Sequence, residues 1–219
     1  MIPLKDMDRR PARFPLVTTL IIGINILVFV LEILKGARFV DRWSFVPHQI
    51  SEGKNLVTIW TSMFMHGGIV HILGNMVYLW AFGPEIEDQL GKTGFILFYL
   101  AGGTVAALAQ TLIAPDSTIP TLGASGAIAS VMGAFIISFP RDRIRTIIFF
   151  GFFFTISLLP AIFLVGFWFI IQLFSEAGSI FERRSGGGIA YMAHIGGFVF
   201  GMITAGVLAR SRKTGGNAR

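Results

Sequence analysis

The sequence predicts an all-α membrane protein built as one bundle of six transmembrane helices, for three reasons. First, 53% of the 219 residues are hydrophobic, only 14% are charged, and the mean hydropathy is +0.71, whereas about a quarter of a soluble domain is charged. Second, several apolar runs approach or exceed the roughly 20 residues that a membrane-spanning helix needs. Third, the charged residues gather at the ends of these runs. The chain length suits one bundle rather than two domains.

The chain divides into a basic N-terminal segment (1–14), a membrane domain (15–209) and a basic tail (210–219), which we expect to be disordered. The first apolar run is too long for a typical signal-peptide core and lacks a convincing cleavage site, so it predicts a retained helix. The fifth run exceeds one untilted span, which predicts a tilt or a kink at Pro160. The six predicted spans are Pro15–Leu34, Ile69–Gly83, Gly94–Ala114, Leu122–Phe139, Ile147–Leu173 and Ile189–Ala209.

The connections are polar. Residues 35–65 combine mixed charge with Trp43 and Trp60, and such aromatic side chains favour the membrane interface. A charged turn is expected at Pro84–Lys92, and a second polar loop runs through Gly188.

The net charge of +6 predicts membrane topology rather than a nucleic-acid partner, because the basic residues flank the apolar runs. Six spans put both termini on one side of the membrane. Of the 18 Lys and Arg residues, 12 fall on that side and 6 on the other. Since basic residues favour the cytoplasmic side, we expect a multi-pass protein of the cell membrane with both termini in the cytoplasm. The absence of cysteine excludes thiol catalysis.

Polar residues recur near the outer ends of three predicted helices that run in the same direction. His71 and Asn75 lie near the start of the second helix, Ser125 near the start of the fourth and His194 near the start of the sixth. Polar and ionisable groups inside a membrane are costly and usually functional. These positions therefore form a candidate site at a similar depth.

Each element also has a purely structural interpretation. Alone, Gly123-Ala124-Ser125-Gly126 is more typical of a helix-packing surface, and His194 of an interhelical hydrogen bond. His71 and Asn75 could equally form a polar clamp between helices. Taken together at matched depth, they favour a serine nucleophile with a histidine base and two donors to an oxyanion. The small residues beside Ser125 and His194 would let the two helices approach closely.

A metal site is disfavoured, and no cofactor is expected. His66, His71 and His194 are three possible ligands, but no carboxylate lies near them in the outer halves of these helices. The spacing of His66 and His71 also differs from the i, i+4 pair of a helical zinc site. His48, in the long connection, has only a structural interpretation.

Three motifs in this order resemble those of the rhomboid intramembrane serine proteases. They are His66-Gly-Gly-Ile-Val-His71-Ile-Leu-Gly-Asn75, Gly123-Ala-Ser125-Gly126 and Ala193-His194-Ile-Gly-Gly197-Phe-Val-Phe-Gly201, and with the segment Phe82–Gly91 the resemblance covers roughly residues 57–207. It implies that Ser125 is the nucleophile and His194 the base, without an acidic third member.

The resemblance also implies supporting roles. The backbone N–H of Ser125 would join His71 and Asn75 in the oxyanion hole. His66 would brace this region through hydrogen bonds. Gly197 and Gly201 would hold the sixth helix against the fourth, while Gly123 and Gly126 would admit a substrate backbone.

Two positions depart from the family pattern. Many members carry a Trp-Arg pair in the first loop, where this chain has Val57 and Thr58. Members may also carry a tyrosine four residues after the serine, which stacks on the catalytic imidazole, and here that residue is Ala129. Other neighbours must therefore orient His194.

These inferences predict an intramembrane serine endopeptidase that cleaves single-span membrane proteins within or beside their transmembrane helices. Substrates would enter laterally. The fifth helix carries Phe163, Phe167 and Trp168 towards its outer end. These residues could equally form a gate for substrates or a lipid-facing aromatic belt. The main alternative is a catalytically inactive relative that binds transmembrane helices. A small transporter is a second alternative, although no internal repeat supports it.

Overall fold

The computed structural model describes residues 1–181 and 191–216 and is mostly helical. The predicted loop through Gly188, with Arg183, Arg184 and the expected start of the last helix at Ile189, lies outside the described residues. In chain order the elements are β1 (Ile2–Asp6), α1 (Leu16–Lys35), α2 (Ala37–Trp43), α3 (Pro47–Ser51), α4 (Thr58–Thr61), η1 (Ser62–Phe64), α5 (Ile69–Ile113), α6 (Ser125–Ser138), β2 (Arg143–Phe150), β3 (Phe153–Pro160), α7 (Ala161–Phe181) and α8 (Tyr191–Gly216).

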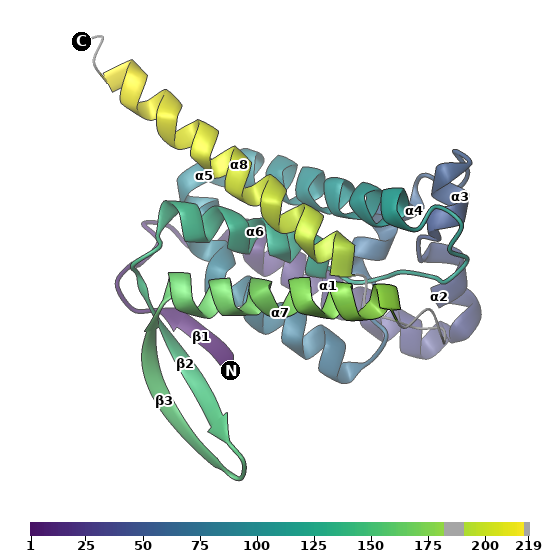
Figure 1. Ribbon diagram of the computed structural model, residues 1–219, viewed down its shortest axis with the longest axis horizontal. Coiled ribbons are helices and arrows are strands. Elements are labelled where there is room, and N and C mark those ends of the chain that lie inside the picture. The colour runs from purple at the N-terminus through teal and green to yellow at the C-terminus, as the bar shows by residue number, and fades with distance from the viewer. Residues whose placement is uncertain (182–190, 217–219) are drawn as a thin grey trace.

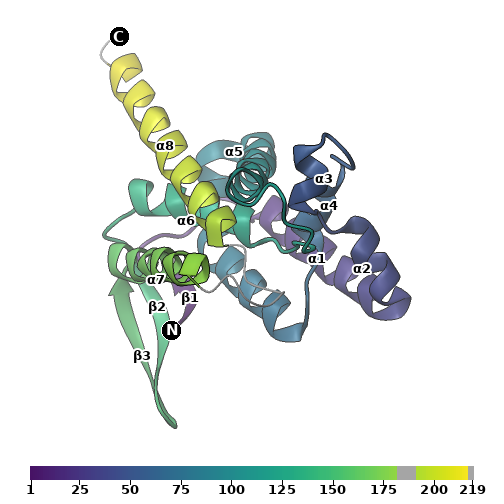
Figure 2. The same ribbon diagram turned by 45° about the vertical axis from the view of Figure 1, so that its right-hand side comes forward.

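Three of the described helices are long and apolar enough to cross a membrane: Leu16–Lys35, Ile69–Ile113 and Tyr191–Ala209. Two shorter apolar helices, Ser125–Ser138 and Ala161–Leu173, accompany them. Helix α6 lies in the middle and packs against α5, α7 and α8 (Figures 1 and 2). The short elements α2, α3 and α4 gather at one end of the bundle, opposite the strands.

The predicted turn at Pro84–Lys92 is wrong, because helix α5 continues through most of it. The backbone leaves helical geometry at Gly91 alone, where φ is +71°. That value is accessible to glycine at little cost, so the chain breaks there although Pro84 lies inside the helix. Helix α5 therefore contains both the predicted second span and the predicted third span.

The prediction of one span over Ile147–Leu173 is also wrong, as is the all-α class. Residues 143–160 form a β-hairpin of β2 and β3, and β1 adds to β2, giving an antiparallel sheet in the order β1-β2-β3. The helix begins only at Ala161, directly after Pro160. Pro160 ends a strand and does not kink a helix.

Helix α8 continues as far as Gly216, into the segment predicted as a basic tail. The sheet is attached to the bundle by its base, where Ile144 is fully buried and belongs to the main core. At the start of α1, the Glu87 carboxylate of α5 accepts hydrogen bonds from the N–H groups of Val17 and Thr18. These N–H groups have no partner within α1, so Glu87 caps the helix from a distance.

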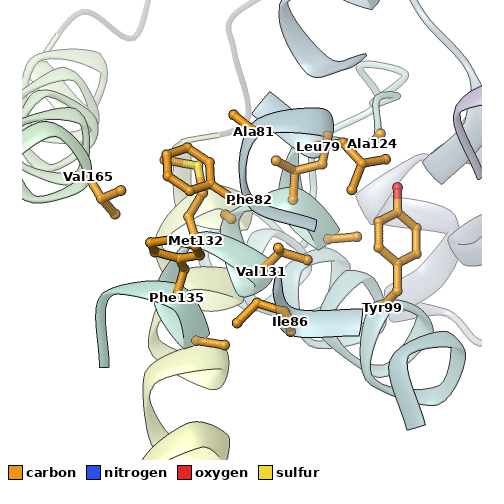
Figure 3. Close-up of a cluster of buried hydrophobic side chains, with 14 of the residues drawn as sticks. Leu79, Ala81, Phe82, Ile86, Tyr99, Ala124, Val131, Met132, Phe135 and Val165 are labelled. Atoms are coloured by element: carbon orange, nitrogen blue, oxygen red, sulfur yellow. The ribbon is translucent and has the colours of Figure 1, made fainter. Parts of the chain in front are cut away.

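The core is centred on α6, where every residue from Gly126 to Phe135 is buried. The ring of Phe135 meets that of Phe82 edge-on, with centroids 5.0 Å apart. The apolar side chains labelled in Figure 3 come from α5, α6, α7 and the segment before α6: Leu79, Ala81, Phe82, Ile86, Tyr99, Ala124, Val131, Met132, Phe135 and Val165. This packing holds the start of α6 in a defined place.

Candidate active site

Ser125 and His194 meet at the centre of the site. Ser125 is the first residue of α6 and His194 lies in the first turn of α8. The Oγ of Ser125 and the Nε2 of His194 are 2.7 Å apart, a hydrogen-bond distance. A histidine nitrogen this close can accept the hydroxyl proton, which is the arrangement of a serine activated by an adjacent base.

A glutamine occupies the other side of the imidazole. The Oε1 of Gln172, on α7, lies 2.7 Å from the Nδ1 of His194, and both side chains are buried. An amide oxygen can only accept, so this contact places the ring proton on Nδ1 and leaves Nε2 free to accept from Ser125. Gln172 thus selects the tautomer that a general base requires.

Aromatic rings complete the surroundings of His194. Trp168, one turn before Gln172 on α7, has its ring centroid 5.7 Å from that of the imidazole. Tyr191 approaches edge-on, with centroids 6.4 Å apart. Ala129, where family members may carry a stacking tyrosine, is fully buried in α6. The orientation of His194 is therefore set by Gln172, Trp168 and Tyr191.

His71 lies beside Gly123, two residues before Ser125. A Cβ built on Gly123 would be 2.9 Å from the Cε1 and Nε2 of His71, and 3.6 Å from the Oγ of Ser125. Gly123 also has φ +130°, which side chains other than glycine rarely allow. Since the first N–H groups of a helix have no partner within it, the start of α6 and the imidazole of His71 present donors on one side of Ser125.

His66 and Asn75 form a hydrogen bond with each other, and His66 contacts the ring of His71. The Nδ2 of Asn75 is 2.9 Å from the Nε2 of His66, and the rings of His66 and His71 meet edge-on at 5.1 Å. The backbone N–H of His66 donates to the Glu32 carboxylate of α1, with N···O distances of 3.0 and 3.2 Å. Glu32 therefore anchors the turn that precedes α5.

Helices α6 and α8 are in backbone contact beside the Ser125–His194 pair. A Cβ on Gly197 would overlap the carbonyl oxygen of Gly126, and one on Gly201 would overlap that of Ser130, both far inside the 3.0 Å that real Cβ atoms keep. Glycine is required at both positions of α8, because only a hydrogen fits between the backbones. This close approach is what brings His194 within reach of Ser125.

A cavity of ≈ 920 Å³ surrounds these groups. It is lined by Ser125, His194, His71, Asn75, Tyr78 and Trp168, among others. Polar groups that converge in one large, mostly apolar cavity are typical of a ligand-binding or active site. Among the described ranges 1–181 and 191–216, no group of three or more His, Cys, Asp or Glu residues could hold a metal ion.

The structure thus brings together all nine residues that the sequence singled out: Ser125, His194, His71, Asn75, His66, Gly123, Gly126, Gly197 and Gly201. The sequence did not single out three further residues of the site: Gln172, Glu32 and Tyr191. Gln172 lies in a run of apolar residues with no recognisable motif, although a lone amide in such a run could have marked it. Glu32 lies on the first helix, whereas the predicted site residues come from the second, fourth and sixth.

The expected position of the aromatic residues on α7 needs correction. Because the helix begins at Ala161, Phe163 lies in its first turn, next to the strands, and not towards the outer end. Phe163 and Phe167 are 69% and 50% exposed, whereas Trp168 faces His194.

The sequence is similar to a known domain family and to several of its members. The model of the Rhomboid domain matches residues 53–211. The yeast Saccharomyces cerevisiae protein "Rhomboid protein 1, mitochondrial" is 31% identical over 134 residues, covering 59% of this chain and 38% of that protein. "Rhomboid protease GluP" of Bacillus subtilis is 29% identical over 203 residues, covering 89% of this chain and 35% of that protein.

A human relative, "Presenilin-associated rhomboid-like protein, mitochondrial", is 31% identical over 144 residues, which cover 64% of this chain and 35% of the relative. The chain thus spans little more than a third of the length of these relatives. The matched domain covers more than half of the chain and contains Ser125, His194, His71 and Asn75. The chain therefore belongs to the rhomboid family.

Proposed function

We propose that the protein is an intramembrane serine endopeptidase that cleaves single-span membrane proteins within or beside their transmembrane helices. The observation that carries the proposal is the 2.7 Å contact between the Oγ of Ser125 and the Nε2 of His194 at the edge of a large cavity. The name of the Bacillus subtilis relative, which includes "protease", supports it.

The reaction follows from the positions of the protons. His194 Nε2 takes the Oγ proton as Ser125 attacks the peptide carbonyl. The Nδ1 proton stays on the ring, hydrogen-bonded to the Oε1 of Gln172. The oxyanion is stabilised by the backbone N–H of Ser125 and by the side chains of His71 and Asn75. His194 returns its proton to the leaving amine. It then takes a proton from water, whose oxygen attacks the acyl-enzyme carbonyl. As the bond to the Oγ of Ser125 breaks, His194 passes this proton to the Oγ and the carboxyl product leaves.

The proposed topology has six crossings. They are α1, the two parts of α5 on either side of Gly91, α6, α7 and α8, with residues 1–14 and 210–219 in the cytoplasm of a cell-membrane protein. Helix α6 has only 14 residues, about 21 Å at 1.5 Å per residue, against a hydrocarbon core of about 30 Å. Ser125 would therefore lie below the outer surface, where the cavity admits water.

The second candidate function is a catalytically inactive rhomboid that binds transmembrane helices. The mitochondrial relatives, whose names state no activity, keep this possibility open. A serine-directed phosphonate probe separates the two functions. Labelling of the wild type and not of Ser125→Ala supports the protease, whereas absence of labelling in both proteins, with binding of a single-span peptide intact, favours the inactive binder.

Gln172→Leu is expected to lower kcat by about 10- to 100-fold and to leave KM nearly unchanged. Leucine keeps the volume but cannot accept the Nδ1 proton, so the imidazole loses its preferred tautomer. The measurement is steady-state cleavage of a single-span substrate in liposomes.

Gln172→Glu is the matched control, because its carboxylate can still accept from Nδ1. It should restore most of kcat, because the ring proton again has an acceptor at Nδ1. Equal loss of kcat in Gln172→Leu and Gln172→Glu would assign Gln172 a packing role only.

His71→Ala is expected to lower kcat by about 10²- to 10³-fold, the usual effect of losing one oxyanion donor. The side chain is exposed in the cavity, so its removal should leave the thermal unfolding temperature nearly unchanged. His48→Ala, in α3, is the control and should cleave like the wild type. A wild-type rate in His71→Ala would remove His71 from the oxyanion hole.

A further inference from the structure

The hairpin of β2 and β3 exposes an unusual set of large apolar side chains. Around its turn the exposed fractions are 103% for Phe152, 80% for Phe153, 66% for Phe154, 64% for Phe150 and 53% for Phe149. We call these five residues the phenylalanine tip. Large contiguous apolar surfaces are rare on proteins in water and mark a site of contact with a partner or a membrane.

Both faces of the tip are apolar. In the register of the hairpin Phe149 pairs with Phe154, and Phe150 with Phe153. Side chains alternate between the faces of a strand, so one pair lies on each face. A sheet that packs on one partner would need only one apolar face. Apolar side chains on both faces and an uncovered turn favour an apolar environment, such as lipid, on all sides of the tip.

The base of the same sheet carries two cations that form no close ion pair within residues 1–181 and 191–216. Lys5 of β1 and Arg145 of β2 are cross-strand partners, and both are exposed. Within residues 1–181 and 191–216, neither makes an ion pair or a hydrogen bond through its side chain. Like charges that face each other across strands destabilise a sheet, so this pair favours an anionic ligand.

Neighbouring Arg143 makes the contrast clear. Its Nε lies 3.0 Å from the carboxylate of Asp8, and its backbone N–H donates to the same group at 2.7 Å. These hydrogen bonds lower the pKa of Asp8 to about 2, so Asp8 is ionised and balances Arg143. Lys5 and Arg145 have no such direct contact with a carboxylate among the described residues, and only Lys5 interacts at longer range, with Glu85.

The position of the hairpin indicates which partner it contacts. In Figures 1 and 2 the hairpin leaves the bundle at an angle to α7, and its turn projects away from the helices. Pro160 leads directly into α7, whose Ile162 and Phe163 are exposed. Exposed apolar residues therefore follow the chain from the phenylalanine tip through Ile156 and Leu158 of β3 to the start of α7.

We propose that this hairpin is a membrane anchor: the phenylalanine tip inserts at the headgroup–acyl boundary of the inner leaflet, and Lys5 and Arg145 bind anionic lipid headgroups. The proposal rests on the topology given under the proposed function and not on proteolysis. The tip stays at the interface, because the open edge of β3 has N–H and C=O groups that hydrocarbon cannot satisfy. Since β3 continues into α7, the anchor holds the end of α7 farthest from Gln172.

The absence of cysteine in the chain allows a direct test. A polarity-sensitive fluorophore is attached to Phe152→Cys in the full chain carrying Ser125→Ala, reconstituted in vesicles of phosphatidylcholine with about 30% phosphatidylglycerol, an anionic lipid. Lipids with a quencher at a shallow or a deep acyl position report its depth. Lys54→Cys, on an exposed loop, is the water control, and Leu27→Cys, in the middle of α1, is the hydrocarbon control.

The label at Phe152 should emit at shorter wavelength than the label at Lys54 and be quenched more by the shallow lipid than by the deep one. Leu27 should show the opposite order. A label at Phe152 that behaves like the one at Lys54 would overturn the proposal. So would efficient cross-linking between Phe152→Cys copies without quenching, which would make a second copy the partner.

The role of the cations is tested in the same protein with Lys5→Gln and Arg145→Gln together. Quenching at Phe152 should decrease when phosphatidylglycerol is left out, and the double variant should abolish this dependence. Arg38→Gln, at the other end of the bundle, is the charge control. Quenching that is independent of lipid charge in all proteins would contradict headgroup binding. Absence of cleavage by the protein with Ser125 intact, with quenching preserved, would count against the protease alone.

Discussion

Ser125→Ala is expected to abolish cleavage of a single-span substrate, with a loss of at least about 10⁴-fold in kcat. The reason is chemical: without the Oγ no acyl-enzyme forms, and the remaining donors and binding groups cannot replace a nucleophile. The measurement is the initial rate of cleavage in liposomes, with the cut position identified by mass spectrometry. Binding of the substrate should persist, because alanine only removes one hydroxyl from the cavity wall.

Ser130→Ala is the matched control. Ser130 lies on the same helix, is fully buried, and donates to the carbonyl of Ala127 at 2.6 Å. Its removal takes a hydroxyl from α6 without touching His194, so cleavage should stay within a few-fold of the wild type. If Ser125→Ala cleaved at the wild-type rate, Ser125 would not be the nucleophile, and the function as a helix-binding protein would be preferred.

Gly201→Ala is the second change with a large expected effect, on both stability and activity. The added Cβ would overlap the carbonyl oxygen of Ser130, a backbone atom that cannot move without shifting α6. Overpacking of this kind costs about 1–3 kcal/mol or more. Because α8 must then separate from α6, His194 moves away from Ser125, and a misplacement of about 1 Å can lower the rate by about 10²-fold.

Gly206→Ala introduces the same methyl group one to two turns farther along α8. A Cβ at Gly206 has no heavy atom within 4 Å, and alanine favours a helix over glycine by up to about 1 kcal/mol. Thermal unfolding in detergent, followed by circular dichroism, should show a lower transition temperature for Gly201→Ala and an equal or higher one for Gly206→Ala. Equal behaviour of the two variants would contradict the close contact of α6 and α8.

These two predictions connect the site to the packing that creates it. The serine and the histidine are 69 residues apart in the chain, and only the contact between glycines at the α6–α8 crossing brings them to hydrogen-bond distance. Gln172 adds α7 to this arrangement, so three helices determine the geometry of one imidazole. A change in the position of α7 would act on His194 through the Gln172 hydrogen bond.

The sequence predicted most helices because hydropathy and length are local properties. The first helix was expected at Pro15–Leu34 and is observed at Leu16–Lys35. The hairpin was missed for a physical reason. A run of Ile and Phe residues is compatible with either a buried helix or a strand, and periodicity alone does not separate them. The aromatic and β-branched content of residues 146–157, and Gly151 at the turn with φ +60°, were the available signs of strands.

By itself, the sequence determined the family, the membrane environment and the residues of the candidate site, because motifs such as Gly123-Ala-Ser125-Gly126 and Ala193-His194 carry their chemistry in their residue types. The tertiary structure decided which groups meet. The partner of His194 Nδ1 is Gln172, the anchor of His66 is Glu32, and the sheet joins residues 2–6 to 143–160. Such contacts join distant parts of the chain, and no local pattern of residues encodes them.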